Sequence, residues 1–271
     1  MSDAGELDAG TPAEEAIPQL LEAYGGRLYG LGLRLCGNEQ DAQDLVQETF
    51  TSAWRKWDQF EGRASAKTWL FTIASRACIR MHRPRSGQPR DVASLQALLP
   101  GAEEGVPDPD VIHASPFEAY LRTEARERLG RALAELDPDF RMPVILKDIM
   151  GLSLIEIGEI LDVKPATVKT RLHRARLQLR AVLLQAVPRR PAEHSPYSDR
   201  VCLDLLEIKM EAMDRGVDFP VPDIELAERC QALHETLDMT RDVCQSIGRE
   251  DLPDEVRDTL LRACQAGALP T

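Results

Sequence analysis

The residues of this 271-residue chain that are best suited to chemistry are the cations of the stretch PATVKTRLHRARLQLR, which runs from Pro165 to Arg180. Lysine and arginine bind phosphate oxygens, and arginine also makes bidentate hydrogen bonds to base edges. The stretch therefore predicts binding to nucleic acid. No phosphate-binding glycine loop, nucleophile motif or pair of carboxylates in a plausible pocket accompanies it, so we expect no catalytic activity.

The elements that position these cations have the pattern of a helix-turn-helix. Ser153 is placed to cap a short helix that ends at Leu161, a turn follows at 162–164, and Pro165 opens a second helix to about Val187. On a helical wheel the second helix has a buried stripe of Val168, Leu172, Ala175 and Leu179. Opposite this stripe lie Ala166, Thr167, Thr170, His173 and Arg174, with Lys169, Arg171 and Arg176 at its flanks.

Small residues at the start of a helix, with cations around them, suit insertion into the major groove of DNA. We expect the DNA contacts to come from Thr167, Lys169, Thr170, Arg171, His173, Arg174 and Arg176. A solvated basic face of an ordinary bundle helix is the alternative. The turn, Pro165 and the one-sided charge together disfavour it.

The basic stretch lies in an acidic chain, whose formal net charge is −12. Residues 191–271 contain 18 acidic residues and 8 basic ones, whereas residues 1–190 contain 27 and 25. Most of the negative charge therefore belongs to the last third of the chain. Binding of nucleic acid depends on local charge, so residues 1–190 can carry a basic surface although the whole chain is acidic.

The rest of the chain predicts an all-α protein. Periodic apolar residues predict helices over 14–35 and 39–57, and a third helix that is capped by Ser65 and ends at Pro84. Residues 86–116 are rich in proline, glycine and acid, which is typical of a flexible linker. Helices resume over 117–135 and from Pro138 to Gly151. Residues 197–271 predict about four short helices, with one break at Asp238–Thr240. No strand is expected.

Composition indicates a cytoplasmic protein of bacterial type. The chain has no run of about 18 apolar residues that would cross a membrane, and its acidic N-terminus is unlike a signal peptide. The six cysteines are therefore expected to be thiols or metal ligands instead of disulfides.

Two long segments resemble one family. The segment DAQDLVQETFTSAWRKWDQFEGRASAKTWLFTIASRACIRMHR (41–83) resembles conserved region two of extracytoplasmic-function (ECF) RNA polymerase sigma factors. The segment LAELDPDFRMPVILKDIMGLSLIEIGEILDVKPATVKTRLHRARLQLR (133–180) resembles their region four. The resemblance implies a region two bundle over 14–85, a flexible acidic linker over 86–116 and a region four helix-turn-helix over 117–187. An acidic helical extension, which the family pattern does not include, follows over 197–271.

The resemblance also implies roles. In this family region two docks on the β′ coiled coil of core RNA polymerase and recognises and melts the −10 element, and region four reads the −35 element and binds the β flap. The implied docking residues are Asp44, Gln47, Glu48 and Thr51. The implied −10 residues are Phe60, Glu61, Gly62, Arg63, Lys67, Arg76, Arg80 and Arg83. Ser75–Arg76 and Arg80 depart from the usual family pattern and add positive charge to this helix.

Two interpretations of the C-terminal extension stay open. Cys230 and His234 lie four residues apart on a predicted helix, and with Cys202 and Cys244 they would supply a tetrahedral zinc site. The regular stripe of Leu226, Cys230, Leu233 and Leu237 instead favours an apolar core, and no other cofactor is expected. Its acidity suggests a module that covers the basic helix and dampens promoter binding, or that contacts polymerase or a regulator such as an anti-sigma factor.

A sigma factor is the leading hypothesis, and two alternatives compete with it. A stand-alone helix-turn-helix transcription regulator would use residues 133–187 in the same way, but it has no reason to carry 41–83. A zinc or thiol sensor would have the C-terminal extension as its sensing module.

Overall fold

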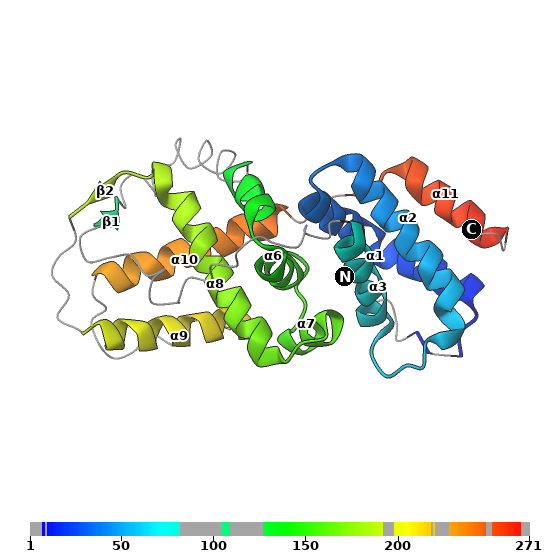
Figure 1. Cartoon of the computed structure of the whole chain (residues 1–271), viewed down its shortest axis with the longest axis horizontal. Helices are drawn as coiled ribbons and strands as arrows, with labels where there is room; N and C mark the ends of the chain where they lie inside the picture. Colours follow the sequence, from blue (N-terminus) through cyan, green and yellow to red (C-terminus); the bar gives the residue numbers. More distant parts are fainter. Residues whose placement is uncertain are drawn as a thin grey trace. The chain divides into compact units, whose positions relative to one another are not determined.

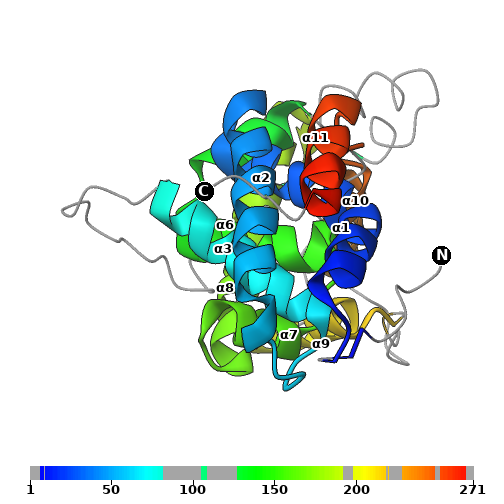
Figure 2. The ribbon, with the colours of Figure 1, turned by 90° about the vertical axis from the view of Figure 1, so that its right-hand side faces the viewer.

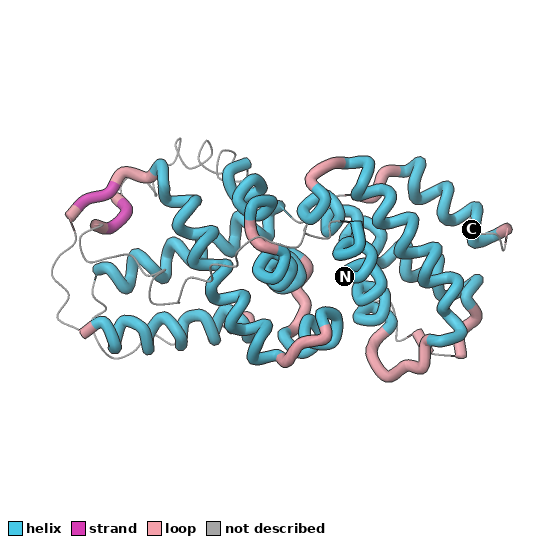
Figure 3. The backbone as a smooth tube through the Cα atoms, in the orientation of Figure 1, coloured by secondary structure: helices cyan, strands magenta, loops and turns pink. Residues whose placement is uncertain are grey.

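The computed structural model describes residues 7–8, 10–81, 105–108, 127–191, 198–217, 219, 228–247 and 251–266. These residues are mostly helical (Figures 1 and 3), so the prediction of an all-α protein is confirmed. The α-helices are α1 (Ala13–Cys36), α2 (Glu39–Lys56), α3 (Ala66–Met81), α6 (Pro138–Val144), α7 (Leu154–Leu161), α8 (Pro165–Leu183), α9 (Asp199–Arg215), α10 (Glu228–Ile247) and α11 (Asp254–Gln265). Residues 127–135 are also helical. Shorter elements are the 3₁₀ turns η1 (Trp57–Gln59) and η5 (Leu184–Ala186) and the π-helical segment η4 (Ile145–Ile149).

The chain divides into two compact units. One contains α1, α2, α3, α7 and α11, and the other contains α6, η4, α8, α9 and α10. Each unit is therefore built from segments that are far apart in the sequence. The last third of the chain contributes α9 and α10 to one unit and α11 to the other.

The first unit is built on the packing of α1, α2 and α3. Gly37 ends α1 at a positive φ of 79°, and the Asn38 side chain caps α2 by accepting a hydrogen bond of 2.8 Å from the amide of Asp41. The Ser65 side chain caps α3 through the amide of Thr68, as predicted. The core consists of fully buried apolar side chains, among them Ile17, Leu28, Leu31, Leu45, Val46, Phe50, Leu70 and Phe71.

Helix α11 packs against α1 and α2 (Figure 2). It buries Val256, Leu260 and Cys264, which recur every four residues on one face. Leu252 lies just before α11, and its side chain packs against the backbone of α1 at Gly25. The end of the acidic extension is thus part of the core of this unit.

The second unit begins with the elements that support α8. The Asp137 side chain caps α6 by accepting a hydrogen bond from the amide of Asp139, and Gly151 has a positive φ of 72° where this helical stretch ends. Helix α8 buries the predicted stripe of Val168, Leu172, Ala175 and Leu179. The predicted bounds of these helices are confirmed to within a few residues.

Two sequence predictions about secondary structure are wrong. Helix α10 continues through Asp238–Thr240, where a break was expected. The Thr236 and Thr240 hydroxyls donate to backbone carbonyls one turn earlier, and Asp238 pairs with Lys209 of α9, so α10 accommodates these polar side chains without a break. The second difference is a short antiparallel pair formed by strands β1 (Val106–Pro107) and β2 (Arg189–Arg190). Tertiary packing supports it, because Val106 is buried.

No helix in the described ranges is both long enough and apolar enough to cross a membrane.

The close approach of α1 and α2 at Gly32 gives a test of this packing. A Cβ on Gly32 would lie 2.8 Å from the Cα of Ala42, so Gly32→Ala forces the two helices apart. We expect a loss of unfolding free energy of about 2 kcal/mol, measured by urea denaturation.

Gly130→Ala is the matched control, since its new Cβ meets nothing within 4 Å. Because Gly130 lies within a helix, this variant should be about 0.5–1 kcal/mol more stable than the parent. Equal destabilisation by the two variants would contradict the packing described here.

Candidate nucleic-acid interface

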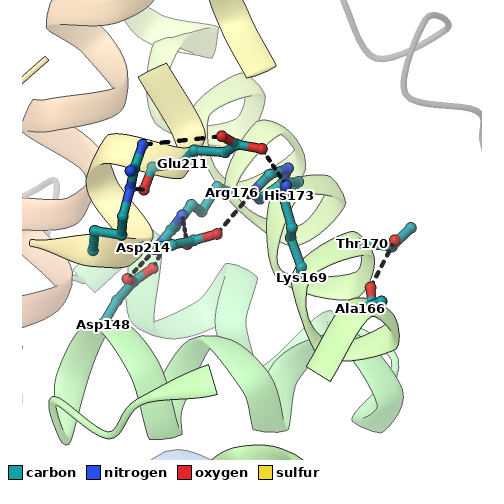
Figure 4. Close-up of polar contacts among 9 residues, drawn as sticks. Asp148, Ala166, Lys169, Thr170, His173, Arg176, Glu211 and Asp214 are labelled. Carbon is teal, nitrogen blue, oxygen red and sulfur yellow. Dashed lines mark hydrogen bonds and ion pairs between the residues drawn. The ribbon is translucent and has the colours of Figure 1, made fainter. Parts of the chain in front are cut away.

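The first turns of α8 present short side chains to solvent. Ala166, Thr167 and Thr170 are exposed, and the Thr170 hydroxyl donates to the Ala166 carbonyl at 3.0 Å. In Figure 4, Thr170 and Ala166 lie on the side of α8 that faces away from α9. This open surface has the small side chains that a helix needs to approach base edges closely.

The cationic flank of α8 is held by acids of α9. Lys169 Nζ lies 2.5 Å from Glu211 Oε1, and the hydrogen bond and positive charge of Lys169 lower the pKa of Glu211 below its ordinary value. Both side chains remain about 40% exposed, at 38% and 45%. Water therefore screens this ion pair, which contributes little to stability.

Deeper along the same flank, His173 and Arg176 are buried in a network of carboxylates (Figure 4). His173 Nε2 lies 2.9 Å from Asp214 Oδ2, and Arg176 Nη1 donates to Asp214 Oδ1 at 2.6 Å. Arg176 also donates from Nε and Nη2 to both oxygens of Asp148, at 2.9 and 2.7 Å. The guanidinium thus joins α8 to η4 through Asp148 and to α9 through Asp214.

The charges in this network stabilise one another. Burial alone would lower the pKa of Arg176, but the adjacent carboxylates of Asp148 and Asp214 raise it above its ordinary value. Burial likewise favours the neutral form of Asp214. The hydrogen bond from His173 and the charge of Arg176 outweigh that effect and keep the pKa of Asp214 below its ordinary value. A buried arginine with two carboxylates needs every partner in place.

An apolar cluster continues the contact between α8 and the extension. Leu177 of α8 packs with Leu206, Met210 and Met213 of α9 and with Leu233 and Leu237 of α10. Arg180, also buried, donates from Nε to the Thr236 hydroxyl at 2.6 Å. The C-terminal half of α8 is therefore buried on the side of the extension as well as along its own apolar stripe.

The burial of His173 and Arg176 differs from the exposure expected from the helical wheel. A helical wheel of α8 predicts one packed face, whereas α9 and α10 cover a second. Leu177, an apolar residue far from the predicted stripe, was the signal in the sequence that a second face is covered. Of the remaining predicted DNA contacts, Arg171 pairs with Asp139 at 3.3 Å and Arg174 is half-buried.

Except for Arg83, the residues predicted to recognise the −10 element lie in the loop before α3 and in α3 itself. Phe60 is buried and stacks on Trp57, with ring centroids 4.9 Å apart, whereas Glu61, Gly62 and Arg63 are exposed. Trp69 closes this aromatic group by packing against both rings. Phe60 therefore anchors the loop, and the three residues after it form its open tip.

The cations of α3 have different surroundings. Lys67 pairs with Glu156 at 2.7 Å, and Arg76 is exposed. Arg80 forms an ion pair with Glu48 of α2, and Arg83 lies outside the described residues. Arg76 and Arg80 are thus both exposed on α3, and Arg80 is also held by Glu48.

The predicted docking residues share one polar face of α2, opposite the buried Leu45, Val46 and Phe50. Asp44 and Gln47 are exposed, and Asp44 accepts a hydrogen bond of 3.2 Å from Gln40. Glu48 and Thr51 are half-buried. The exposed carboxylate and amide suit a partner with basic or polar side chains.

The four candidate zinc ligands do not come together. The Cys230 and Cys202 sulfurs are 3.3 Å apart, but His234 packs edge-on against Phe219, with ring centroids 4.6 Å apart. Cys244 is buried, and burial raises the pKa of its thiol. Within the described residues, no group of three or more histidine, cysteine or acidic side chains is arranged to hold a metal ion.

The buried network predicts a large cost for Asp148→Ala. The variant leaves Arg176 charged and buried with only one of its two carboxylates, so we expect a loss of unfolding free energy of about 3 kcal/mol in urea denaturation. Glu61→Ala is the control, since Glu61 pairs with Arg63 at the surface, and it should change stability by less than about 0.5 kcal/mol. A similarly small loss of unfolding free energy in both variants would contradict the proposed contribution of the Arg176 network to stability.

His234 predicts a loss of stability in mild acid. Burial lowers its pKa from 6.5 to about 4, so the unfolded chain binds a proton below pH 6.5 that the folded chain does not bind until about pH 4. Stability should therefore fall as the pH drops from about 6.5 to about 4, by about 2 kcal/mol after allowance for solvent screening. In His234→Leu this part of the pH dependence of urea unfolding should disappear. An unchanged profile between pH 5 and 6.5 would contradict the assignment.

Comparison with known families agrees with the two resemblances seen in the sequence. The model described as Sigma-70 region 2 matches residues 20–87, and the model described as Sigma-70, region 4 matches residues 126–179. Helices α2 and α3 lie within the first match, and α6 and α7 lie within the second, which also includes most of α8. Residues 180–271 lie outside both.

Individual relatives carry the same description. The ECF RNA polymerase sigma factor SigE of Mycolicibacterium smegmatis is 38% identical over 176 residues, which are 64% of this chain and 65% of that protein. The ECF RNA polymerase sigma factor SigW of Bacillus subtilis is 32% identical over 176 residues, which are 63% of this chain and 90% of that protein. The chain thus spans slightly less than two thirds of the first relative and most of the second.

Two solved structures are also similar in sequence. CnrH in complex with the cytosolic domain of CnrY is 26% identical with a TM-score of 0.47, and the match covers 67% of this chain and 97% of CnrH. The sigma factor RpoE in complex with the anti-sigma factor NepR from Bartonella quintana is 26% identical with a TM-score of 0.41, and the match covers 62% and 96%. These TM-scores are too low to add to the assignment. The two family models, in their order along the chain, and the match to SigW place this protein in the extracytoplasmic-function family of RNA polymerase sigma factors.

Proposed function

We propose that this protein binds core RNA polymerase and directs it to specific promoters, with α8 reading the −35 element and the α1–α3 unit recognising and melting the −10 element. One observation supports this most directly. The start of α8, with Ala166, Thr167 and Thr170 exposed, lies inside the region four match. A helix that exposes short side chains at its N-terminal end is suited to read bases in the major groove.

The proposed docking surface for polymerase is the polar face of α2 around Asp44 and Gln47. Both side chains are exposed, and the helix is fixed behind them by the buried Leu45, Val46 and Phe50. A rigid, exposed, partly acidic face is suited to a basic coiled coil such as the one the family contacts on the β′ subunit. The β flap is the corresponding partner of region four in this proposal.

The exposed loop tip of Glu61, Gly62 and Arg63 is the proposed receptor for −10 DNA. Gly62 has a positive φ of 69°, which lets the chain turn sharply above the aromatic base formed by Trp57, Phe60 and Trp69. An unstacked base costs a few kcal/mol to extrude, so a rigid loop is favoured as its receptor. Arg76, which is exposed on the following helix α3, is placed to bind a DNA phosphate.

In this proposal the protein acts in the cytoplasm as a non-catalytic subunit. A stand-alone helix-turn-helix regulator is not favoured, because the region two match at residues 20–87 has no role in it. The zinc or thiol sensor is not favoured either, because the two sigma-factor matches at residues 20–87 and 126–179 have no role in it.

Reconstitution tests the proposal directly. The protein is combined with core polymerase and genomic DNA, and transcript start sites are mapped. We expect a set of start sites with shared upstream sequences near −35 and −10. Failure to bind core polymerase, or start sites identical to those of core alone, would overturn the proposal.

Thr170→Asp then tests the role of α8. The exposed position tolerates aspartate in the fold, but the added charge would face DNA phosphates. Transcription from the mapped promoters should fall about tenfold or more with binding to core unchanged. Thr259→Asp on α11 is the matched control, because Thr259 is also exposed and its hydroxyl also bonds a carbonyl one turn earlier. Equal losses in both variants would contradict a reading role for α8.

A further inference from the structure

The acidic extension contributes two carboxylates to the flank of α8 that would meet DNA. Glu211 and Asp214 lie three residues apart on α9, so they share one face of that helix. Lys169, His173 and Arg176 recur at four and three residues on α8 and likewise share one face. The two faces contact each other: Glu211 pairs with Lys169, and Asp214 pairs with His173 and Arg176.

These contacts have the chemistry of a phosphate contact. Carboxylate and phosphate oxygens accept the same charge-assisted hydrogen bonds from lysine, histidine and arginine. The polar atoms of the three pairs lie 2.5–2.9 Å apart, so the α9 carboxylates occupy donors that a DNA backbone would need. A phosphate and an α9 carboxylate cannot hold the same donors at once.

The base-reading side of α8 is left open by the same arrangement. Thr170 and Ala166 lie on the side of α8 away from α9 (Figure 4). Helix α9 therefore covers the cationic flank of α8 and leaves the short side chains of Ala166 and Thr170 exposed. Phosphate contacts supply most of the affinity for DNA and base contacts supply the sequence preference, so covering this flank would weaken binding without altering the sequence that is read.

The strength of the contact differs along α9. The Lys169–Glu211 pair is partly exposed and weak, whereas Asp214 is buried beside Arg176, and Leu177 packs against Leu206 and Met210. Asp148 lies on η4 and not on the extension, and it would keep Arg176 paired if α9 moved away. Arg176 thus keeps one of its two carboxylate partners when α9 moves away.

We propose that α9 is an intramolecular competitor of DNA, whose carboxylates Glu211 and Asp214 hold the cationic flank of α8 and lower the affinity of the protein for promoters until α9 is displaced. This inference rests on the proposed function of α8. A tethered competitor acts at a high effective concentration, and it raises the apparent dissociation constant in proportion to the fraction of molecules that it covers.

Neutralising variants of the full-length protein test the competition. Glu211→Gln removes the charge that holds Lys169, and Glu207→Gln is the matched control, an exposed acid one turn earlier on α9 for which the described residues provide no ion pair. Both variants change the net charge equally. Binding to a fluorescently labelled, mixed-sequence DNA duplex is measured over a range of salt concentrations, because phosphate contacts do not depend on sequence.

We expect Glu211→Gln to bind the duplex about threefold to fivefold more tightly than Glu207→Gln. Its slope of log K against log salt should be steeper by about one, since Lys169 becomes an additional phosphate contact. Glu211→Gln/Asp214→Asn should bind about tenfold more tightly than the parent, because it also frees His173 from Asp214, while Arg176 stays paired with Asp148. Acetylation of Lys169 by an N-hydroxysuccinimide ester, followed by mass spectrometry, should be faster in Glu211→Gln than in Glu207→Gln.

The outcomes separate this inference from the function on which it depends. Duplex binding of equal affinity by the parent and all variants would overturn the competition and leave the DNA-binding role of α8 intact. Equal gains in Glu211→Gln and Glu207→Gln would assign the effect to net charge and overturn it as well. Absence of DNA binding by every protein, the double variant included, would overturn both proposals.

Discussion

The burial of the Arg176 guanidinium between two carboxylates is the interaction on which the second unit depends. Asp148 receives two hydrogen bonds from it and Asp214 a third, and all three side chains are nearly inaccessible to water. A charge in this position is costly unless every partner is present, so the arginine fixes α8 against η4 and positions α9 beside α8. This position of α9 beside α8 also determines which side chains Lys169, His173 and Leu177 contact.

One helix consequently has three different surroundings. Val168, Leu172 and Leu179 face the core, His173 and Leu177 face the extension, and Thr167 and Thr170 face solvent. Recognition of DNA requires the third side to be rigidly presented, and the two packed sides provide this rigidity. The same packing pairs the cations of the second side with carboxylates. Contacts that stabilise this unit therefore make those cations less available to DNA phosphates.

Local signals predicted the helices well, because caps, glycine ends and apolar stripes act within one or two turns. Gly37, Ser65, Asp137 and the Val168 stripe have the predicted roles. Long-range pairing was not predictable in this way. Nothing local to His173 indicates that its partner is Asp214, 41 residues later, and the strands β1 and β2 are too short to leave a pattern in the sequence. The family resemblance also ended before the extension, so it could not indicate that α9 covers part of α8.

Hydrogen exchange of the α9 amides tests whether DNA and α9 compete for α8. Exchange is compared between the free protein and the protein bound with core polymerase to a mapped promoter. We expect the amides of α9 to exchange faster in the promoter complex, because α8 has transferred its cationic flank to DNA and released α9. Protection of α9 that is unchanged or greater in the complex would contradict this competition.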